Sequence, residues 1–183
     1  MFRFFAPSYH VHSVSELTPP RLAAMGLEAL LVDADSTLKH YSSEECLPEA
    51  AAWLADLRAG GIGLCLISNG RRRRIERFAA SIGLPFVAKA FKPLPYSCRN
   101  AVRKMGFSAA RTAIVGDQVF ADVLAGRLAG LATTILVDPV HPEEEHWFTR
   151  LKRRPERWLV RRMTAAGLIR ELPEGEGDEG MRG

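Results

Sequence analysis

Apolar runs alternate with helical patterns along most of the chain. Continuous apolar runs, typical of strands that are covered on both faces, lie at residues 27–33, 62–68, 85–90, 111–117 and 132–138. Segments with the helical spacing of apolar residues lie between them, at residues 48–59, 71–82, 93–105 and 119–129. A glycine follows each of these segments, as expected beyond a helix C-terminus, at Gly60, Gly83, Gly106 and Gly130.

Short connections between alternating strands and helices predict a parallel sheet with helices on both faces. We therefore expect an α/β fold, a three-layer α/β/α sandwich built on a Rossmann-like parallel sheet. In such a sheet the ligand lies at the carboxyl ends of the strands. Polar residues follow several predicted strands at this position, namely Asp33, Ser68, Lys92 and Asp117.

Two carboxylates, Asp33 and Asp35, follow the first predicted strand. If the strand continues, side-chain alternation points both the same way. Two close carboxylates cannot both stay charged without compensation, so they either share a proton or hold a cation. Asp117, which arrives from another strand end, adds a third carboxylate and favours the cation. A site of a few carboxylates suits Mg²⁺, which usually shares its site with a phosphate.

Lys92 and Ser68 suit a phosphate ligand. Lys92 precedes Pro93, and proline is favoured at the first helical position, so we expect Lys92 at a helix N-cap. An ammonium at the positive end of a helix favours a bound dianion. Ser68 and the backbone N–H groups near Asn69 are suited to donate to phosphate oxygens. Singly, each residue also fits a turn, a cap or a solvated side chain, so the functional interpretation rests on their joint occurrence at successive strand ends.

These residues carry a resemblance to the haloacid dehalogenase superfamily. "DADST" resembles its first motif, "LISNG" with Ser68 its second, "FKP" with Lys92 its third, and "GDQVFAD" its fourth. The longer stretches "LTPPRLAAMGLEALLVDADSTL" and "VGDQVFADVLAGRLAG" are similar to subclass IIIA, the YqeG-like phosphatases, a group related to the mitochondrial phosphatidylglycerophosphate phosphatases. Ser36 departs from the family pattern, which often has Asn there, and the run Arg71 to Arg74 exceeds it.

The resemblance implies a two-step phosphoryl transfer. Asp33 would attack phosphorus and form an aspartyl-phosphate, which replaces one hard step with two easier ones. Asp35 would protonate the leaving oxygen and then activate the hydrolytic water.

The resemblance also implies the residues that bind phosphate and metal. Thr37 would help to fix the loop, and Ser68, Asn69 and Lys92 would bind the transferring phosphoryl group. Mg²⁺ would be held by the Asp33 carboxylate, the Asp35 backbone carbonyl and Asp117. Asp122 would give support, by binding a metal-bound water or by orienting Lys92.

The segments in which this superfamily inserts cap domains are short here. Between Leu38 and Pro48 there is room for a flap, and between Ser68 and Lys92 for one helix and a short strand. We therefore expect no large cap domain, so the site either admits the head of a large substrate or is covered by a partner subunit. The predicted organisation is a lead-in that packs on the core at 1–26, the phosphatase domain at 27–168, and a disordered acidic, glycine-rich tail at 169–183.

The charge is uneven. The formal net charge is +4, but Arg71 to Arg74 and the segment from Arg150 to Met163 are strongly basic. This distribution predicts an anionic partner, and we favour a phosphorylated substrate or anionic lipid over nucleic acid. The second basic segment also has bulky apolar residues, so its helix either lies on an anionic membrane or packs on the sheet with its charges outward.

The remaining composition narrows the class. No apolar run is long enough to span a bilayer, and the first residues lack the pattern of a signal peptide, so we expect a cytoplasmic protein with possible peripheral contact at the membrane. Cys46, Cys65 and Cys98 form no CxxC pair, which disfavours a disulfide framework or a zinc site.

The predicted activity is a Mg²⁺-dependent phosphomonoester hydrolase with phosphatidylglycerophosphate as the favoured substrate and phosphatidylglycerol as the product. The alternatives are a phosphatase for soluble sugar or nucleotide phosphates, and a membrane or nucleic-acid binding module with weak phosphatase activity. The oligomeric state is left open.

Overall fold

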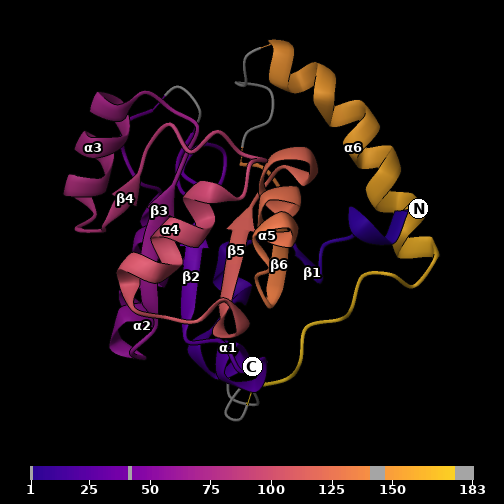
Figure 1. Ribbon diagram of the computed structural model, residues 1–183, viewed down its shortest axis with the longest axis horizontal. Helices are drawn as coiled ribbons and strands as arrows, with labels where there is room; N and C mark the ends of the chain where they lie inside the picture. Colours follow the sequence, from indigo (N-terminus) through magenta and orange to yellow (C-terminus); the bar gives the residue numbers. More distant parts are fainter. Residues whose placement is uncertain (1, 41–42, 141–146, 176–183) are drawn as a thin grey trace.

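A computed structural model describes residues 2–40, 43–140 and 147–175 of the chain (Figure 1). Its strands form one six-stranded sheet in the order β1-β6-β5-β2-β3-β4, and every neighbouring pair is parallel. The strands are β1 Tyr9–Val11, β2 Ala29–Val32, β3 Gly63–Ile67, β4 Phe86–Val87, β5 Thr112–Gly116 and β6 Thr133–Val137. The predicted α/β sandwich with a parallel, Rossmann-like sheet is confirmed.

The helices lie where the apolar spacing predicts most of them. They are α1 Pro19–Ala24, α2 Pro48–Ala59, α3 Arg72–Ser81, α4 Tyr96–Met105, α5 Leu124–Ala129 and α6 Trp147–Ala165. The short turns are η1 Phe2–Phe4, η2 Val14–Glu16, η3 Ala109–Arg111 and the single π-helical turn η4 Val119–Val123. The segment predicted as one helix at 119–129 is therefore a π turn followed by a short α-helix.

The two faces of the sheet carry separate apolar clusters. Leu30 and Val32 of β2 pack in a cluster that includes buried residues of α1, α2 and α3. Leu31, which lies between them, packs in a second cluster with α4 and α5. This alternation follows from the period of two along a strand. Because both faces are covered, the strands read as continuous apolar runs.

An edge strand, β1, was not predicted from the sequence. It pairs with β6, with Tyr9 beside Ile135 and Val11 beside Val137. The strand is only three residues long and His10 interrupts its two buried apolar residues, so the local pattern is too short to indicate a strand. The lead-in predicted at 1–26 thus contributes a strand to the sheet.

The last helix, α6, lies on the side of the molecule opposite α3 (Figure 1). Leu159 and Met163 of α6 are buried in a cluster with Val119 and Leu136. Beyond this helix, the Arg170 N–H donates to the Ser8 carbonyl at 3.0 Å. The remainder of the predicted tail, 176–183, lies outside the described residues.

No cap domain is inserted within the described residues. The interval between β2 and α2 has no helix or strand of its own there, and the interval between β3 and α4 holds only α3 and β4. A separate search finds that none of the helices in the described part of the chain is both long enough and apolar enough to cross a bilayer. The carboxyl edge of the sheet is therefore not covered by an inserted domain.

Candidate active site

The strand order places the candidate site at a topological switch point. From β2 the chain proceeds to β3 on one side of the sheet, whereas β5, which lies on the other side of β2, is followed by β6. Val32 of β2 lies beside Val115 of β5, so Asp33 and Asp117 follow neighbouring strands. Ligands of open parallel sheets bind in the crevice at such a point, outside the carboxyl ends of the strands.

Lys92 is buried among acceptors at this edge. Its ammonium nitrogen Nζ donates to Asp33 Oδ1, to Asp122 Oδ1 at 2.6 Å and to the Ile67 carbonyl at 3.0 Å. These three contacts match the three protons of an ammonium. Burial lowers the pKa of Lys92, but Asp122 and Asp33 outweigh this effect, so the pKa is raised and the side chain stays charged. Lys92 is thus a fixed cation between two carboxylates.

The expected N-cap position of Lys92 is wrong. Helix α4 begins at Tyr96 and its N-cap is Pro95, so Lys92 lies in the preceding turn. The second proline, rather than Pro93, stands next to the helix. Tertiary contacts place Lys92 instead.

Asn69 contributes to the placement of Lys92. Its side-chain amide donates to the Lys92 carbonyl at 3.0 Å, and its Oδ1 accepts from the Lys92 N–H at 2.7 Å. The structure therefore shows Asn69 joining the ends of two strand-to-helix connections. Direct phosphate binding by this side chain stays a prediction.

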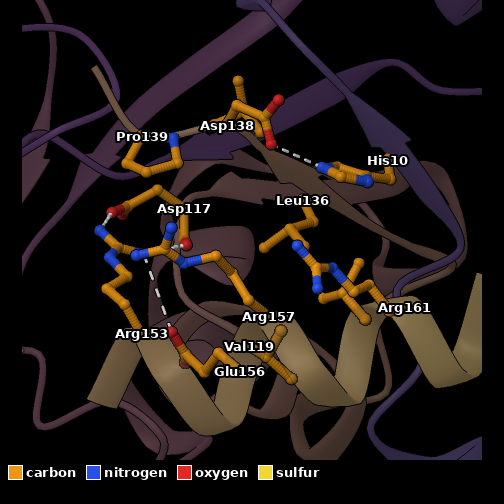
Figure 2. A pocket seen from close by; sticks show the side chains of 12 residues that line it. His10, Asp117, Val119, Leu136, Asp138, Pro139, Arg153, Glu156, Arg157 and Arg161 are labelled. Atoms are coloured by element: carbon orange, nitrogen blue, oxygen red, sulfur yellow. Dashed lines mark hydrogen bonds and ion pairs between the residues drawn. The ribbon is translucent and has the colours of Figure 1, made fainter. Parts of the chain in front are cut away.

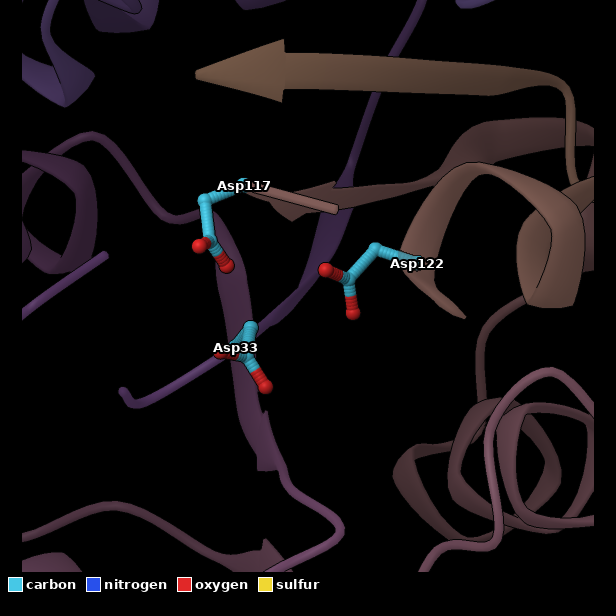
Figure 3. A group of neighbouring side chains, drawn as sticks. All are labelled: Asp33, Asp117 and Asp122. Atoms are coloured by element: carbon cyan, nitrogen blue, oxygen red, sulfur yellow. The ribbon is translucent and has the colours of Figure 1, made fainter. Parts of the chain in front are cut away.

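Three buried carboxylates lie together at the carboxyl edge, those of Asp33, Asp117 and Asp122 (Figure 3). One ligand oxygen from each lies within 4.8 Å of the others. Gly116 makes this approach possible, because a Cβ at that position would lie 2.3 Å from Asp122 Cγ. Asp122 comes from the π turn η4, and its Oδ2 accepts from the Gln118 N–H at 3.1 Å.

The cluster has more negative charge than Lys92 alone compensates. Burial raises the pKa of Asp33 well above its ordinary range, Lys92 acts in the opposite direction, and Asp122 and Asp117 raise it further. One ammonium shared by Asp33 and Asp122 does not offset both the burial and the neighbouring acids. A further cation among these oxygens would hold Asp33 ionised.

Arg153 of α6 reaches into the same cluster. Its guanidinium donates to the Asp117 side chain and, at 2.5 Å, to the Asp117 carbonyl. One turn along the helix, Glu156 accepts from the Phe120 N–H at 2.9 Å. Helix α6 is thereby tied to the connection that presents Asp117. The sequence showed Arg153 only as one of many basic residues, and no local signal pointed to this contact.

Asp35 has partners different from those of Asp33. Arg74 of α3 donates to both of its oxygens, at 2.8 and 2.5 Å, and Lys39 Nζ lies 2.7 Å from Oδ1. Burial raises the pKa of Asp35, but Arg74 and Lys39 outweigh it, so the pKa is lowered. Because β2 ends at Val32, the strand does not continue through Asp35, and the side-chain alternation that depended on this continuation does not apply.

Arg74 changes the interpretation of the basic run at Arg71 to Arg74. This run suggested an external anionic partner, yet one of its members pairs with a candidate catalytic carboxylate. Lys39 is likewise absent from the predicted set although it is fully buried. The excess of arginine at the start of α3 was the one sequence signal that could have indicated this pair.

Ser68 and Thr37 are buried hydroxyls near the strand ends. Ser68 Oγ accepts from the Gly70 N–H at 3.0 Å, which leaves its own proton available for donation. Within the described residues, Thr37 Oγ1 has no hydrogen-bond partner, so the structure shows no brace through that hydroxyl. Their roles toward phosphate, and that of the Asp35 carbonyl toward metal, stay predictions.

Comparison with known families agrees with this arrangement. Residues 14–130 match the model of the haloacid dehalogenase-like hydrolases. A protein of Bacillus subtilis (strain 168), named "Probable phosphatase YqeG", is 31% identical over 167 residues, which are 91% of this chain and 96% of that protein.

This chain belongs to the haloacid dehalogenase-like hydrolases. The predicted superfamily and the similarity to a YqeG protein are confirmed, and so is the prediction that the chain is an enzyme, a hydrolase of this superfamily. Neither match addresses the relation to phosphatidylglycerophosphate phosphatases.

Solved structures support the fold. The cobalt-bound deoxy-D-mannose-octulosonate 8-phosphate phosphatase YrbI of Haemophilus influenzae aligns with a TM-score of 0.50 and 18% identity, over 62% of this chain and 69% of that one. NagD of E. coli K-12 also aligns with a TM-score of 0.50 and 18% identity, over 61% of this chain and 87% of that one. At these identities the likeness concerns the fold alone.

Proposed function

We propose that this hydrolase is a Mg²⁺-dependent phosphomonoesterase that acts through an aspartyl-phosphate intermediate on Asp33. The observation that carries the proposal is the convergence of Asp33, Lys92, Asp117 and Asp122 in one buried cluster at the switch point of the sheet. Family membership and the relative named a probable phosphatase support the phosphatase class.

The donor set fits Mg²⁺. Carboxylate oxygens are hard ligands of the kind this ion prefers, and those of Asp33, Asp117 and Asp122 lie within 4.8 Å of one another. Burial, together with Asp122 and Asp117, raises the pKa of Asp33 against the charge of Lys92, and a bound cation would oppose that rise. We assign the ion to Asp33, the Asp35 carbonyl and Asp117, with Asp122 in support. When bound, Mg²⁺ would neutralise charge on the transferring phosphoryl group.

In the first step, an Asp33 oxygen attacks phosphorus and the ester oxygen leaves. Lys92, held by Asp122, keeps a positive charge beside Asp33, where the phosphoryl oxygens accumulate negative charge. Ser68 donates its free hydroxyl proton to one of these oxygens. In the second step, water attacks phosphorus, the bond between phosphorus and the Asp33 oxygen breaks, and inorganic phosphate leaves as the Asp33 carboxylate is restored.

Asp35 is assigned the proton transfers. Its lowered pKa keeps it ionised while Arg74 and Lys39 are bound, which is the state of the general base in the second step. To donate a proton to the leaving oxygen in the first step, it must be protonated. Loosening of the Arg74 contact when substrate binds would permit this change.

The loop around Lys92 favours a lipid as the substrate. Phe91 and Leu94, on either side of Lys92 and Pro93, are 68% and 51% exposed, and Tyr96 is 72% exposed. Exposed apolar side chains beside an active site are typical of an interaction surface. Contact with a membrane would cover them and bring a phosphorylated lipid headgroup to the carboxyl edge.

The outer face of α6 also fits an anionic membrane. Leu151 and Trp158 are exposed, and the Arg162 guanidinium lies 5.4 Å from the centroid of the Trp158 ring. Residues at spacings of 3 and 4 share one face of a helix, so these three lie on the side away from buried Met163. Apolar groups framed by arginine characterise helices at a lipid interface.

These features support a lipid phosphate as the substrate, and we propose phosphatidylglycerophosphate, with phosphatidylglycerol as the product, for a cytoplasmic enzyme with peripheral membrane contact. The rival proposals are hydrolysis of soluble sugar or nucleotide phosphates, and a binding role with weak phosphatase activity. A panel of lipid, sugar and nucleotide phosphates separates them. A lipid phosphatase gives the highest kcat/KM on dispersed phosphatidylglycerophosphate, whereas a higher value on a soluble ester would refute the lipid assignment.

The catalytic assignment is tested with Asp33→Asn. Removal of the nucleophile is expected to lower phosphate release from an aryl phosphate with Mg²⁺ by at least about a thousandfold. Asp56→Asn, which changes an exposed carboxylate on α2, is the matched control and should keep full activity. Mass spectrometry of acid-quenched enzyme should find phosphate on Asp33 in the wild type alone. Full activity of Asp33→Asn would show that Asp33 is not the nucleophile.

A further inference from the structure

A cavity of about 390 Å³ adjoins the candidate active site between α6 and the carboxyl end of β6 (Figure 2). Asp117 lines this cavity and also belongs to the carboxylate cluster, so the cavity and the candidate active site share that residue. Val119, Leu136 and Val160 supply apolar lining, and Arg157 and Arg161 line it from α6. The cavity therefore combines an apolar surface with basic groups next to the reacting centre.

The acids that line the cavity already have basic partners. Arg153 donates to Asp117 and has one guanidinium nitrogen 3.8 Å from Glu156 Oε2. Asp138 has a histidine nitrogen beside each of its oxygens. His10 Nε2 lies 2.8 Å from Oδ1, and His12 Nδ1 lies 2.7 Å from Oδ2. Because these three carboxylates already have basic partners, they do not neutralise the other arginines that line the cavity.

Arg157 and Arg161 are these other arginines. Neither pairs with a carboxylate in the part of the chain that the structure describes. They lie four residues apart on α6, so they occupy one face on successive turns. The planar guanidinium group of arginine can donate two parallel hydrogen bonds to a pair of phosphate or carboxylate oxygens. The cavity thus has unsatisfied donors suited to an anion, beside apolar surface suited to the carbon skeleton that carries it.

We propose that this cavity is a second anion subsite, in which Arg157 and Arg161 bind an anionic group on the alcohol part of the phosphomonoester substrate. The inference rests on the proposed function, because the subsite contributes to hydrolysis only when the monoester of the same molecule lies at Asp33. The matching substrate class has a phosphodiester near the phosphomonoester. A glycerophospholipid phosphate and its water-soluble headgroup share this chemistry.

Hydrolysis kinetics test the subsite. The soluble headgroup glycerophosphoglycerophosphate has both a diester and a monoester, whereas glycerol 3-phosphate has the monoester alone. Arg157→Gln and Arg161→Gln should each lower kcat/KM for the headgroup by about tenfold, the factor of one charge-assisted hydrogen bond, and leave glycerol 3-phosphate unchanged. Arg154→Gln, an exposed arginine of α6 that does not line the cavity, is the matched control. An equal effect on both substrates would overturn the proposal.

A lipid arm separates the subsite from a membrane contact. If dispersed phosphatidylglycerophosphate and the soluble headgroup lose activity together in the two variants, the arginines bind the shared diester. If only the lipid loses activity, the arginines contact the vesicle and the subsite is refuted.

A binding measurement keeps the test independent of turnover. Glycerophosphoglycerol, which has the diester but no monoester, is titrated into the full chain by calorimetry. Binding that weakens about tenfold in Arg157→Gln and Arg161→Gln, but not in Arg154→Gln, supports the subsite even if no substrate is hydrolysed and the proposed function fails. Equal or absent binding in the wild type and both variants refutes the subsite, whether or not the enzyme is a phosphatase.

Discussion

At the scale of single residues, the two aspartates of "DADST" are placed in opposite electrostatic conditions. Asp33 is buried beside Asp117 and Asp122 and shares the Lys92 ammonium with Asp122, and burial raises its pKa. Asp35 forms ion pairs with Arg74 and Lys39, which lower its pKa. Environments that push the pKa values of two carboxylates apart are a common way to divide chemical roles between them. As the proposed nucleophile, Asp33 must be ionised, which a cation bound among these oxygens would favour, whereas Asp35, the proposed base, is held ionised by Arg74 and Lys39.

Outside the carboxylate cluster, Lys39 is the residue whose replacement we expect to lower the free energy of unfolding most. It is fully buried, pairs with Asp35, and donates to the carbonyls of His40 and Ser43. Lys39→Met would break a buried ion pair and remove the donor to both carbonyls, so we expect the free energy of unfolding to fall by about 3 kcal/mol. Urea denaturation measures it.

Lys104→Met, on the exposed side of α4, serves as the comparison for Lys39→Met and should change the unfolding free energy little. Equal stability of the two variants would mean that the buried network around Asp35 contributes nothing to folding.

At the scale of elements, α6 does more than cover the edge of the sheet. Arg153 and Glu156, one turn apart, bind the connection between β5 and η4 through Asp117 and the Phe120 N–H. Leu159 and Met163 anchor the same helix in an apolar cluster. A helix far along the chain therefore helps to orient a candidate metal ligand.

Glu156 makes this attachment dependent on pH. Burial raises its pKa from 4.5 to about 7, against the opposing hydrogen bond from Phe120 and the charge of Arg153. Since the folded-state pKa is the higher one, folding takes up a proton in this range. The stabilisation is complete below pH 4.5 and is lost as the pH rises through about 7.

Glu156→Gln stays neutral and still accepts from Phe120, so it should remove this loss. From about pH 5 to about pH 8, the variant should gain on the order of 2 kcal/mol in unfolding free energy relative to the wild type. Denaturant unfolding at both pH values measures the difference. Glu76→Gln, at an exposed position of α3, controls for loss of charge. If the unfolding free energies of the wild type and Glu156→Gln changed in parallel with pH, the raised pKa of Glu156 would be contradicted.

At the scale of the whole molecule, the open carboxyl edge lies beside surfaces suited to an interface. Phe91 and Leu94 flank Lys92, while α6 presents Trp158 and several arginines outward. The formal net charge of +4 has the sign that anionic lipid attracts. This combination makes the membrane proposal measurable without any substrate.

We expect the protein to bind phosphatidylglycerol vesicles more tightly than phosphatidylcholine vesicles. Raising the salt from about 0.05 to about 0.5 M should weaken this binding, because the Debye length shrinks. Phe91→Ser with Leu94→Ser should weaken it about tenfold through loss of apolar burial. Cosedimentation measures the bound fraction.

The matched control for the vesicle test is Leu128→Ser. Leu128 is 37% exposed near the end of α5, at the amino edge of the sheet, so its change should leave vesicle binding intact. Vesicle binding that does not depend on lipid charge would contradict a docking surface beside Lys92. Full binding by the Phe91→Ser, Leu94→Ser variant would contradict it as well.

The sequence by itself determined the alternation of strands and helices and the strand-end positions of Asp33 and Asp117. Apolar periodicity is local, and parallel strands bring their carboxyl ends to one edge, so these predictions needed no coordinates. Only the tertiary structure decided that β1 completes the sheet, that Arg74 holds Asp35 and that Arg153 reaches Asp117. Those contacts join side chains from distant segments, and packing between elements, which leaves no period in the sequence, brings them together.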